Sequence, residues 1–132
     1  MEIREWQEVG RVPVTVFHLK GELNVSTYEM LQEQARAAHA NGARDLILDL
    51  SEITYVSSAG IRALQSVFNQ FRGATPAESD EAMRKGLSDG TFRSPHVKLV
   101  NPLPRVVEVL KIAGIDMFLE IHPALPQALA SF

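Results

Sequence analysis

A short, almost uninterrupted apolar segment in the first half of the chain constrains its fold more than any other feature. The segment Asp45–Leu50 is apolar at every position after Asp45 except Asp49. A strand of this composition is typical of a sheet that is covered by helices. A helical pattern lies on each side of the segment, and a further strand pattern precedes them. The order strand, helix, strand predicts a right-handed crossover within an α/β sheet.

The two helical patterns have recognisable starting points. Ser26 and Glu29 have the spacing of a capping box, which predicts a helix that begins at Ser26 and ends near Asn41-Gly42. A second helix is expected from about Ser58, because apolar residues then recur at spacings of three and four: Ile61, Leu64, Phe68 and Phe71. The intervening residues, Ser51–Val56, are expected to form a connection.

The rest of the chain completes a mixed sheet. Ile3–Val9 and Val12–Leu19 are expected to pair as a hairpin, and further strands are expected at Val97–Val100 and Phe118–Ile121. Helices are predicted from Asn101 to Gly114 and over Pro123–Ala130. Residues 73–96 form a polar insertion, within which Pro76–Lys85 is either a short helix or part of a loop. We therefore expect one α/β domain with four to five strands and about four helices.

Composition excludes several classes of protein. A chain of 132 residues fits one domain, since a single core serves roughly 100–200 residues. The absence of cysteine excludes disulfides, thiolate metal sites and cysteine nucleophiles. A net charge of −3 argues against general nucleic-acid binding, which needs a basic surface. No stretch has the ~18–20 apolar residues of a membrane span, and the first residues lack a signal core, so we expect a soluble, cytoplasmic protein.

The sequence contains no convincing enzyme motif. Neither common glycine-rich phosphate loop is present. The four histidines share no metal-ligand spacing: His18, His39, His96 and His122. The segment around Ser58 is similar to a nucleophile elbow but lacks the glycine two positions before the serine. We therefore predict no catalytic residue, no metal and no cofactor.

The most informative motif is Ser57-Ser58-Ala59-Gly60, at the expected start of the second helix. Serine commonly caps a helix by accepting hydrogen bonds from its first amides, and this role alone would explain one of the two hydroxyls. The other hydroxyl is then spare. The small residues Ala59 and Gly60 are expected to leave the helix start open to the backbone of a partner. A serine in this position is a reasonable target for a kinase.

The segments Gly21–Asn24 and Asp49–Leu64 resemble the STAS domain of anti-sigma factor antagonists. The order of the expected elements agrees with that family, as does Asn101-Pro102 before the third helix. The resemblance implies one STAS domain over residues 1–132 and a regulatory role in bacterial transcription. Such a protein binds an anti-sigma factor that is also a serine kinase, is released when phosphorylated, and is restored by a serine phosphatase.

The resemblance also assigns individual residues. The phosphorylated serine of the family matches Ser58, and Asn24 matches a loop position that meets the kinase. Many phosphorylated members have Asp immediately before the acceptor, whereas this chain has Ser57, which becomes a rival acceptor. Together with the motif, these matches define the expected partner-binding residues: Asn24, Val25, Ser26, Ser57, Ser58, Ala59, Gly60 and Arg62.

Other functions within the same family remain open from the sequence. Some STAS proteins are scaffold subunits of large stress-signalling assemblies, whereas the switch protein is expected to be a monomer or weak homodimer. A cytoplasmic domain of an anion transporter is disfavoured, because the sequence contains no membrane segment. A nucleotide sensor is also disfavoured, because no loop that would hold phosphates is present.

Overall fold

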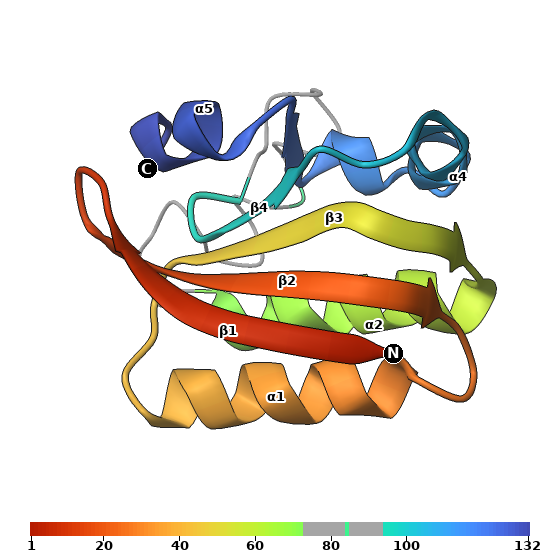
Figure 1. Ribbon diagram of the computed structural model, residues 1–132, viewed down its shortest axis with the longest axis horizontal. Coiled ribbons are helices and arrows are strands. Elements are labelled where there is room, and N and C mark those ends of the chain that lie inside the picture. Colours follow the sequence, from red (N-terminus) through yellow and green to blue (C-terminus); the bar gives the residue numbers. More distant parts are fainter. Residues whose placement is uncertain (73–83, 85–93) are drawn as a thin grey trace.

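The computed structural model describes residues 1–72, 84 and 94–132. Its centre is a five-stranded sheet in which each strand pairs with the next along the chain (Figure 1). The strands are β1 (Glu2–Val9), β2 (Pro13–Leu23), β3 (Leu46–Val56), β4 (Val97–Val100) and β5 (Glu120–His122). The β1–β2 pair is antiparallel, and the three following pairs are parallel. Most of the predicted 73–96 insertion, with the alternative helix at Pro76–Lys85, lies outside the described residues.

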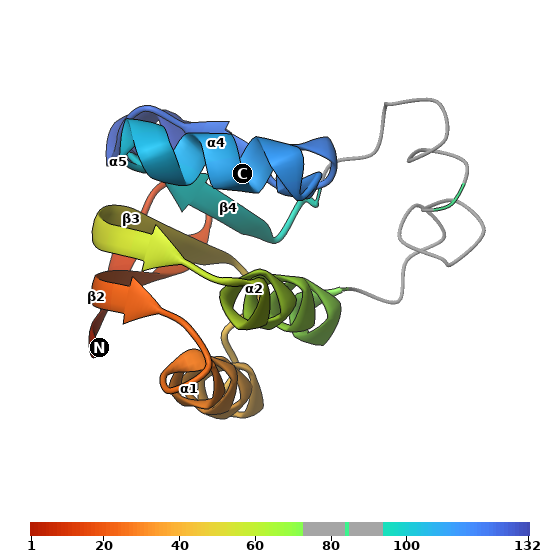
Figure 2. The same ribbon diagram turned by 90° about the vertical axis from the view of Figure 1, so that its right-hand side faces the viewer.

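Helices pack on both faces of this sheet. They are α1 (Tyr28–Ala40), α2 (Ser58–Phe71), α4 (Pro104–Ile112) and α5 (Leu125–Ala130), with a 3-10 turn, η2 (Ile115–Met117), after α4. Figure 2 shows α1 and α2 together beside the sheet, and α4 and α5 at its β4 end. This arrangement confirms the predicted α/β fold with a mixed sheet.

The apolar residues of β2 and β3 separate into two cores, one for each face of the sheet. Phe17 and Leu48 belong to the larger core, which includes side chains from α1, α2 and α4. Val16 and Ile47 belong to a smaller core that is covered by Ala128 of α5. Alternate residues of a strand point to opposite faces, so a strand in the middle of this sheet is apolar at nearly every position. The prediction of a buried strand at Asp45–Leu50 is thereby explained.

Strand β3 is longer than expected, and the predicted connection Ser51–Val56 is wrong. These residues continue the strand and pair with the end of β2, where Gly21 lies opposite Ile53 and Leu23 opposite Val56. Two register irregularities accompany this pairing, and at each of them β3 advances one residue more than β2. The extension is stabilised by burial, because Ile53, Val56 and Leu23 all belong to the larger core. Irregular pairing of this kind depends on the neighbouring strand and is not visible in a local pattern.

The predicted capping box at Ser26 is also wrong. Helix α1 begins at Tyr28 after Thr27, and no side chain caps its first amides. Instead, the Asn24 carboxamide oxygen accepts from the Ser26 amide at 2.9 Å. The Thr27 hydroxyl accepts from the Asn24 amide at 2.9 Å and donates to the Glu22 carbonyl at 2.7 Å. These bonds close a compact turn between β2 and α1, which fixes the loop that contains Asn24, Val25 and Ser26.

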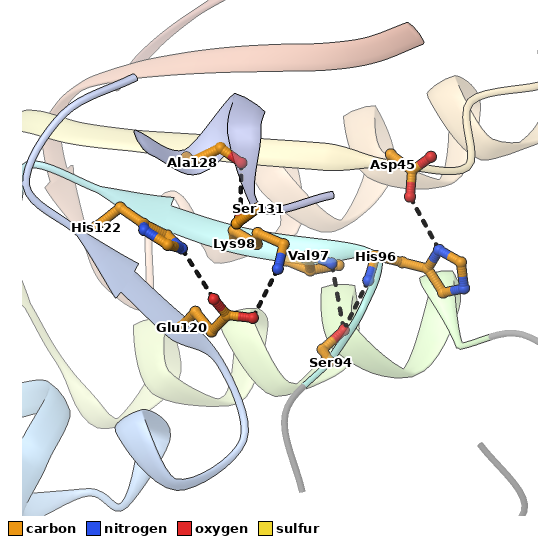
Figure 3. Close-up of polar contacts among 9 residues, drawn as sticks. All are labelled: Asp45, Ser94, His96, Val97, Lys98, Glu120, His122, Ala128 and Ser131. Carbon is orange, nitrogen blue, oxygen red and sulfur yellow. Dashed lines mark hydrogen bonds and ion pairs between the residues drawn. The ribbon is translucent and has the colours of Figure 1, made fainter. Parts of the chain in front are cut away.

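Polar contacts connect the last two strands (Figure 3). Lys98 of β4 is only 2 % exposed, and its ammonium donates to Glu120 of β5 at 2.6 Å. The same carboxylate contacts His122 at 3.0 Å. The Lys98 ammonium also lies 5.0 Å from the centre of the Phe132 ring. The cation is therefore paired with a carboxylate and covered by the C-terminal residue, as a buried charge requires.

Candidate protein-binding site at the start of helix α2

The two serines at the start of α2 have different environments. The Ser57 hydroxyl accepts from the Gly60 amide at 3.3 Å and caps the helix, and the Ser57 amide donates to the Leu23 carbonyl at 2.9 Å. Ser58 is the first helical residue and is exposed to solvent. Its hydroxyl makes no hydrogen bond with any residue that the structure describes. Ser57 therefore has the structural role, and Ser58 presents a free hydroxyl.

Gly60 has an internal role that differs from the expected one. It is buried, and a Cβ atom at this position would lie 2.4 Å from the Leu23 carbonyl oxygen. Such a contact is far too short, so the glycine permits α2 to approach the end of β2. Ala59 is also largely buried, at 7 % exposure. The expectation that the helix start is open to a partner's backbone is therefore corrected for Gly60, whereas Ala59 retains a small accessible surface.

Most of the predicted binding residues lie around one shallow groove. Its volume is about 410 Å³, and its lining consists of Asn24, Val25, Tyr55, Ser57, Ser58, Ala59 and Arg62. Strands β2 and β3 end side by side next to the start of α2 (right-hand side of Figure 1). The carboxyl ends of neighbouring parallel strands thus bring two loops together that are distant in sequence. Ser26 is exposed on the first loop but is not part of this lining, and neither is Gly60.

Sequence reasoning missed Tyr55, which contributes to the same groove. Tyr55 is 52 % exposed, and it lies opposite Glu22 in the register of β2 and β3. An aromatic residue two positions before the serine pair is the available signal in the sequence. Sequence reasoning also missed the last turn of α4, which shares a second groove with Ser57 and Ser58 although it lies some fifty positions after them in the sequence. Only the tertiary structure brings these α4 residues to the site.

The electrostatics of the first groove favour an anion. Arg62 is exposed one turn after Ser58, and it forms no ion pair within the described part of the chain. No acidic side chain lines the groove. A hydrogen bond to Glu29 raises the pKa of the Tyr28 phenol, and the positive charge of Arg62 acts in the opposite direction. The start of α2 adds the partial positive charge of a helix N-terminus. A negative group on Ser58 would therefore be compatible with the fold.

In residues 1–72, 84 and 94–132, no group of three or more His, Asp or Glu side chains is arranged to hold a metal ion. No helix in these ranges has the length and apolar character needed to cross a bilayer. The site at the start of α2 consists of the Ser58 hydroxyl, the exposed side chains of Val25 and Tyr55, and Arg62.

Comparison with known proteins identifies the family. The model of the STAS domain matches residues 5–75, which is more than half of the chain. The chain therefore belongs to the STAS domain family, and the resemblance found in the sequence is confirmed. A relative, BtrV of Bordetella bronchiseptica, is named as an anti-sigma factor antagonist and is 37 % identical over 54 residues. The match covers 41 % of this chain and 47 % of the relative, so it spans about half of the relative's length.

Solved structures share the fold at low sequence identity. An anti-sigma factor antagonist from Mycobacterium paratuberculosis superposes with a TM-score of 0.70 and 20 % identity, covering 98 % of this chain and 93 % of that one. The phosphorylated form of SpoIIAA, a Bacillus cell-fate determinant, gives 0.60 and 15 %, covering 97 % and 96 %. The STAS domain of a SulP transporter from Vibrio cholerae has the same fold, and so does a part of the murine anion transporter Slc26a9, of which 18 % is covered. At these identities the likeness establishes the fold alone.

Proposed function

We propose that this protein is an anti-sigma factor antagonist that binds an anti-sigma factor at the start of α2 and is switched off by phosphorylation of Ser58. The observation that carries the proposal is the free, exposed hydroxyl of Ser58 beside a groove that contains Val25 and Tyr55. The relation to BtrV, which is named as an anti-sigma factor antagonist, supports this choice within the family. The partner would be a serine kinase as well as an anti-sigma factor, and the protein itself would be a non-enzymatic binding module.

The proposed switch is electrostatic. The kinase transfers the γ-phosphoryl group of ATP to the Ser58 oxygen, the hydroxyl proton leaves, and ADP is released. The phosphate adds about −1.5 to −2 charges at neutral pH. A like charge at about 4 Å costs roughly 4 kcal/mol at an effective dielectric constant of about 20, which corresponds to nearly three orders of magnitude in affinity. The complex would therefore dissociate, while the helix N-terminus accommodates the phosphate.

Ser58 is a better acceptor than the rival Ser57. The Ser57 hydroxyl is engaged as the helix cap, and the residue is only partly exposed. Modification of Ser57 would remove that hydrogen bond and place a bulky group against the close contact between α2 and β2. Modification of Ser58 requires no rearrangement within the domain. A phosphatase would return the protein to its binding state.

The kinase assay tests this proposal directly. The protein is incubated with ATP and the purified anti-sigma factor kinase of its source cell, the modified peptide is mapped by mass spectrometry, and the Kd is measured before and after by calorimetry. We expect one phosphate on Ser58, no phosphate on the Ser58→Ala variant, and a full level on Ser57→Ala. Tight binding that persists after complete phosphorylation would exclude the switch. Absence of binding by the unmodified protein would exclude the antagonist function.

A mimic of the phosphorylated state gives an independent prediction. Ser58→Glu should weaken binding of the anti-sigma factor by at least about tenfold, because it introduces a negative charge beneath the docked partner. The thermal unfolding transition should be unchanged, because Ser58 is exposed and makes no internal hydrogen bond. Size-exclusion chromatography of the same samples should give a monomer or weak dimer, whereas a very large particle would indicate a scaffold subunit instead.

A further inference from the structure

A second groove also includes Ser58 in its lining but not Arg62. Its volume is about 440 Å³, and its lining consists of Tyr55, Val56, Ser57, Ser58, Ile61, Val109, Ile112 and Ala113. These residues come from the end of β3, the first turns of α2 and the last turn of α4. None of the lining side chains is charged. We refer to these residues as the α2–α4 groove.

The lining of the α2–α4 groove includes strongly exposed apolar side chains. Ile112 is 88 % exposed, which makes it the most exposed large apolar side chain in the described part of the chain. Val109, one turn earlier on α4, also lines the groove and packs partly against the larger core. Tyr55, at the end of β3, lines the same groove and is 52 % exposed. An exposed isoleucine beside an aromatic ring and a hollow is typical of a surface that another protein covers.

The α2–α4 groove is continuous with the groove that contains Arg62. Both are lined by Tyr55, Ser57 and Ser58. The two grooves therefore meet at Ser58: the lining of one includes Arg62, and the lining of the other includes no charged residue. A protein that docks on Ser58 is therefore placed directly beside the α2–α4 groove.

We propose that the anti-sigma factor that docks on Ser58 inserts an apolar side chain into the α2–α4 groove, with Ile112 and Tyr55 as the anchoring contacts. This inference rests on the proposed function and extends the interface to α4. It also gives the switch a second component. An apolar segment packed between Tyr55 and Ile112 excludes water next to Ser58, and a phosphate that appears there loses hydration. The same contact that strengthens the complex would then make it intolerant of phosphorylation.

Two substitutions test the α2–α4 groove against a matched control. Ile112→Ser removes the anchor, and Ala113→Arg places a long charged side chain at the mouth of the groove. The control is Val9→Ser, since Val9 is 84 % exposed but lies at the distant end of β1. Binding of the purified anti-sigma factor kinase is measured by calorimetry. We expect each groove variant to raise the Kd about tenfold or more, and the control to change it less than twofold.

The outcomes separate this inference from the proposed function. If the wild-type protein binds the kinase and both groove variants bind it as tightly as Val9→Ser does, the α2–α4 groove is not part of the interface and the antagonist function stands. If the wild-type protein does not bind, both proposals fall. If Ile112→Ser instead abolishes a concentration-dependent dimer seen by sedimentation without changing the Kd, a second copy of the chain occupies the groove and the inference is overturned. All four proteins should retain one thermal transition.

Discussion

At the scale of single residues, the two adjacent serines have different roles: Ser57 stabilises the start of α2, and Ser58 carries the hydroxyl of the proposed switch. Ser57→Ala removes the hydroxyl that accepts from the Gly60 amide and should lower the free energy of unfolding by about 1 kcal/mol, as the loss of a helix cap does. Ser58→Ala should change it by less than about 0.5 kcal/mol, because the Ser58 hydroxyl is exposed and unbonded. Urea denaturation of the two variants measures the difference. Equal losses would mean that Ser58 shares the capping role.

Gly60 defines how closely α2 approaches β2. In Gly60→Ala the new methyl group would lie 2.4 Å from the Leu23 carbonyl oxygen, so the helix must move away from the strand. We expect a loss of about 1–3 kcal/mol in unfolding free energy, in spite of the higher helix propensity of alanine. Asn69→Ala, at an exposed position of the same helix, is the control and should be nearly neutral. A Gly60→Ala protein as stable as the wild type would contradict the close packing.

At the scale of elements, a histidine on β2 connects two strands just before the register irregularity. The His18 ring contacts Asp49 at 3.0 Å and Glu52 at 2.5 Å, both on β3. Hydrogen bonds to Glu52 and then to Asp49 raise the pKa of His18 above 6.5. Because this pKa is higher in the folded state than in the unfolded state, the protonated His18 ring stabilises the fold fully below about pH 6.5. This stabilisation is lost as the pH rises through the folded-state pKa of His18. The hydrogen bond between His18 and Glu52 also lowers the pKa of Glu52 below 4.5, so the stabilisation by this pair declines in stronger acid as well.

The resulting prediction concerns the sign of a pH dependence. The difference in unfolding free energy between the wild type and His18→Gln should be largest at pH values between the pKa of Glu52 and the pKa of His18. It should shrink as the pH rises from about 6 to 9. His39 gives a contrast, because burial lowers its pKa, and His39→Gln should therefore show a difference that shrinks as the pH falls. Denaturation curves at several pH values measure both. A His18→Gln difference that grows above neutral pH would rule out the ionic link between β2 and β3.

The elements also show what local patterns can and cannot predict. The apolar strand at Asp45–Leu50 and the helix that begins near Ser58 were predicted well, because burial leaves a periodic trace in the sequence. The Ser26 cap and the end of β3 were not, since competing bonds from Asn24 and the pairing with β2 decide them. Of the site, the loops at the ends of β2 and β3 could be inferred from their common sheet edge. The contribution of α4, including Ile112, required the tertiary structure.

At the scale of the whole molecule, the sheet connects two cores that should unfold together. Helix α5 covers the smaller core, where Ala128 is fully buried against Val16 and Ile47, and β3 carries side chains of both cores. A charge at Ala128 cannot be hydrated while α5 remains in place, so Ala128→Asp should destabilise the protein by about 3 kcal/mol or more.

The matched substitution Ala130→Asp, at an exposed position of the same helix, should cost less than about 1 kcal/mol. Because β3 also ends at the Ser57–Ser58 site, we expect one cooperative transition in Ala128→Asp, with loss of partner binding in proportion to the unfolded fraction. Circular dichroism and calorimetric binding at the same temperatures test this coupling. If Ala128→Asp instead melted in two steps and kept full binding after the first, α5 would be an independent cover and the site would be maintained by α1, α2 and the larger core alone.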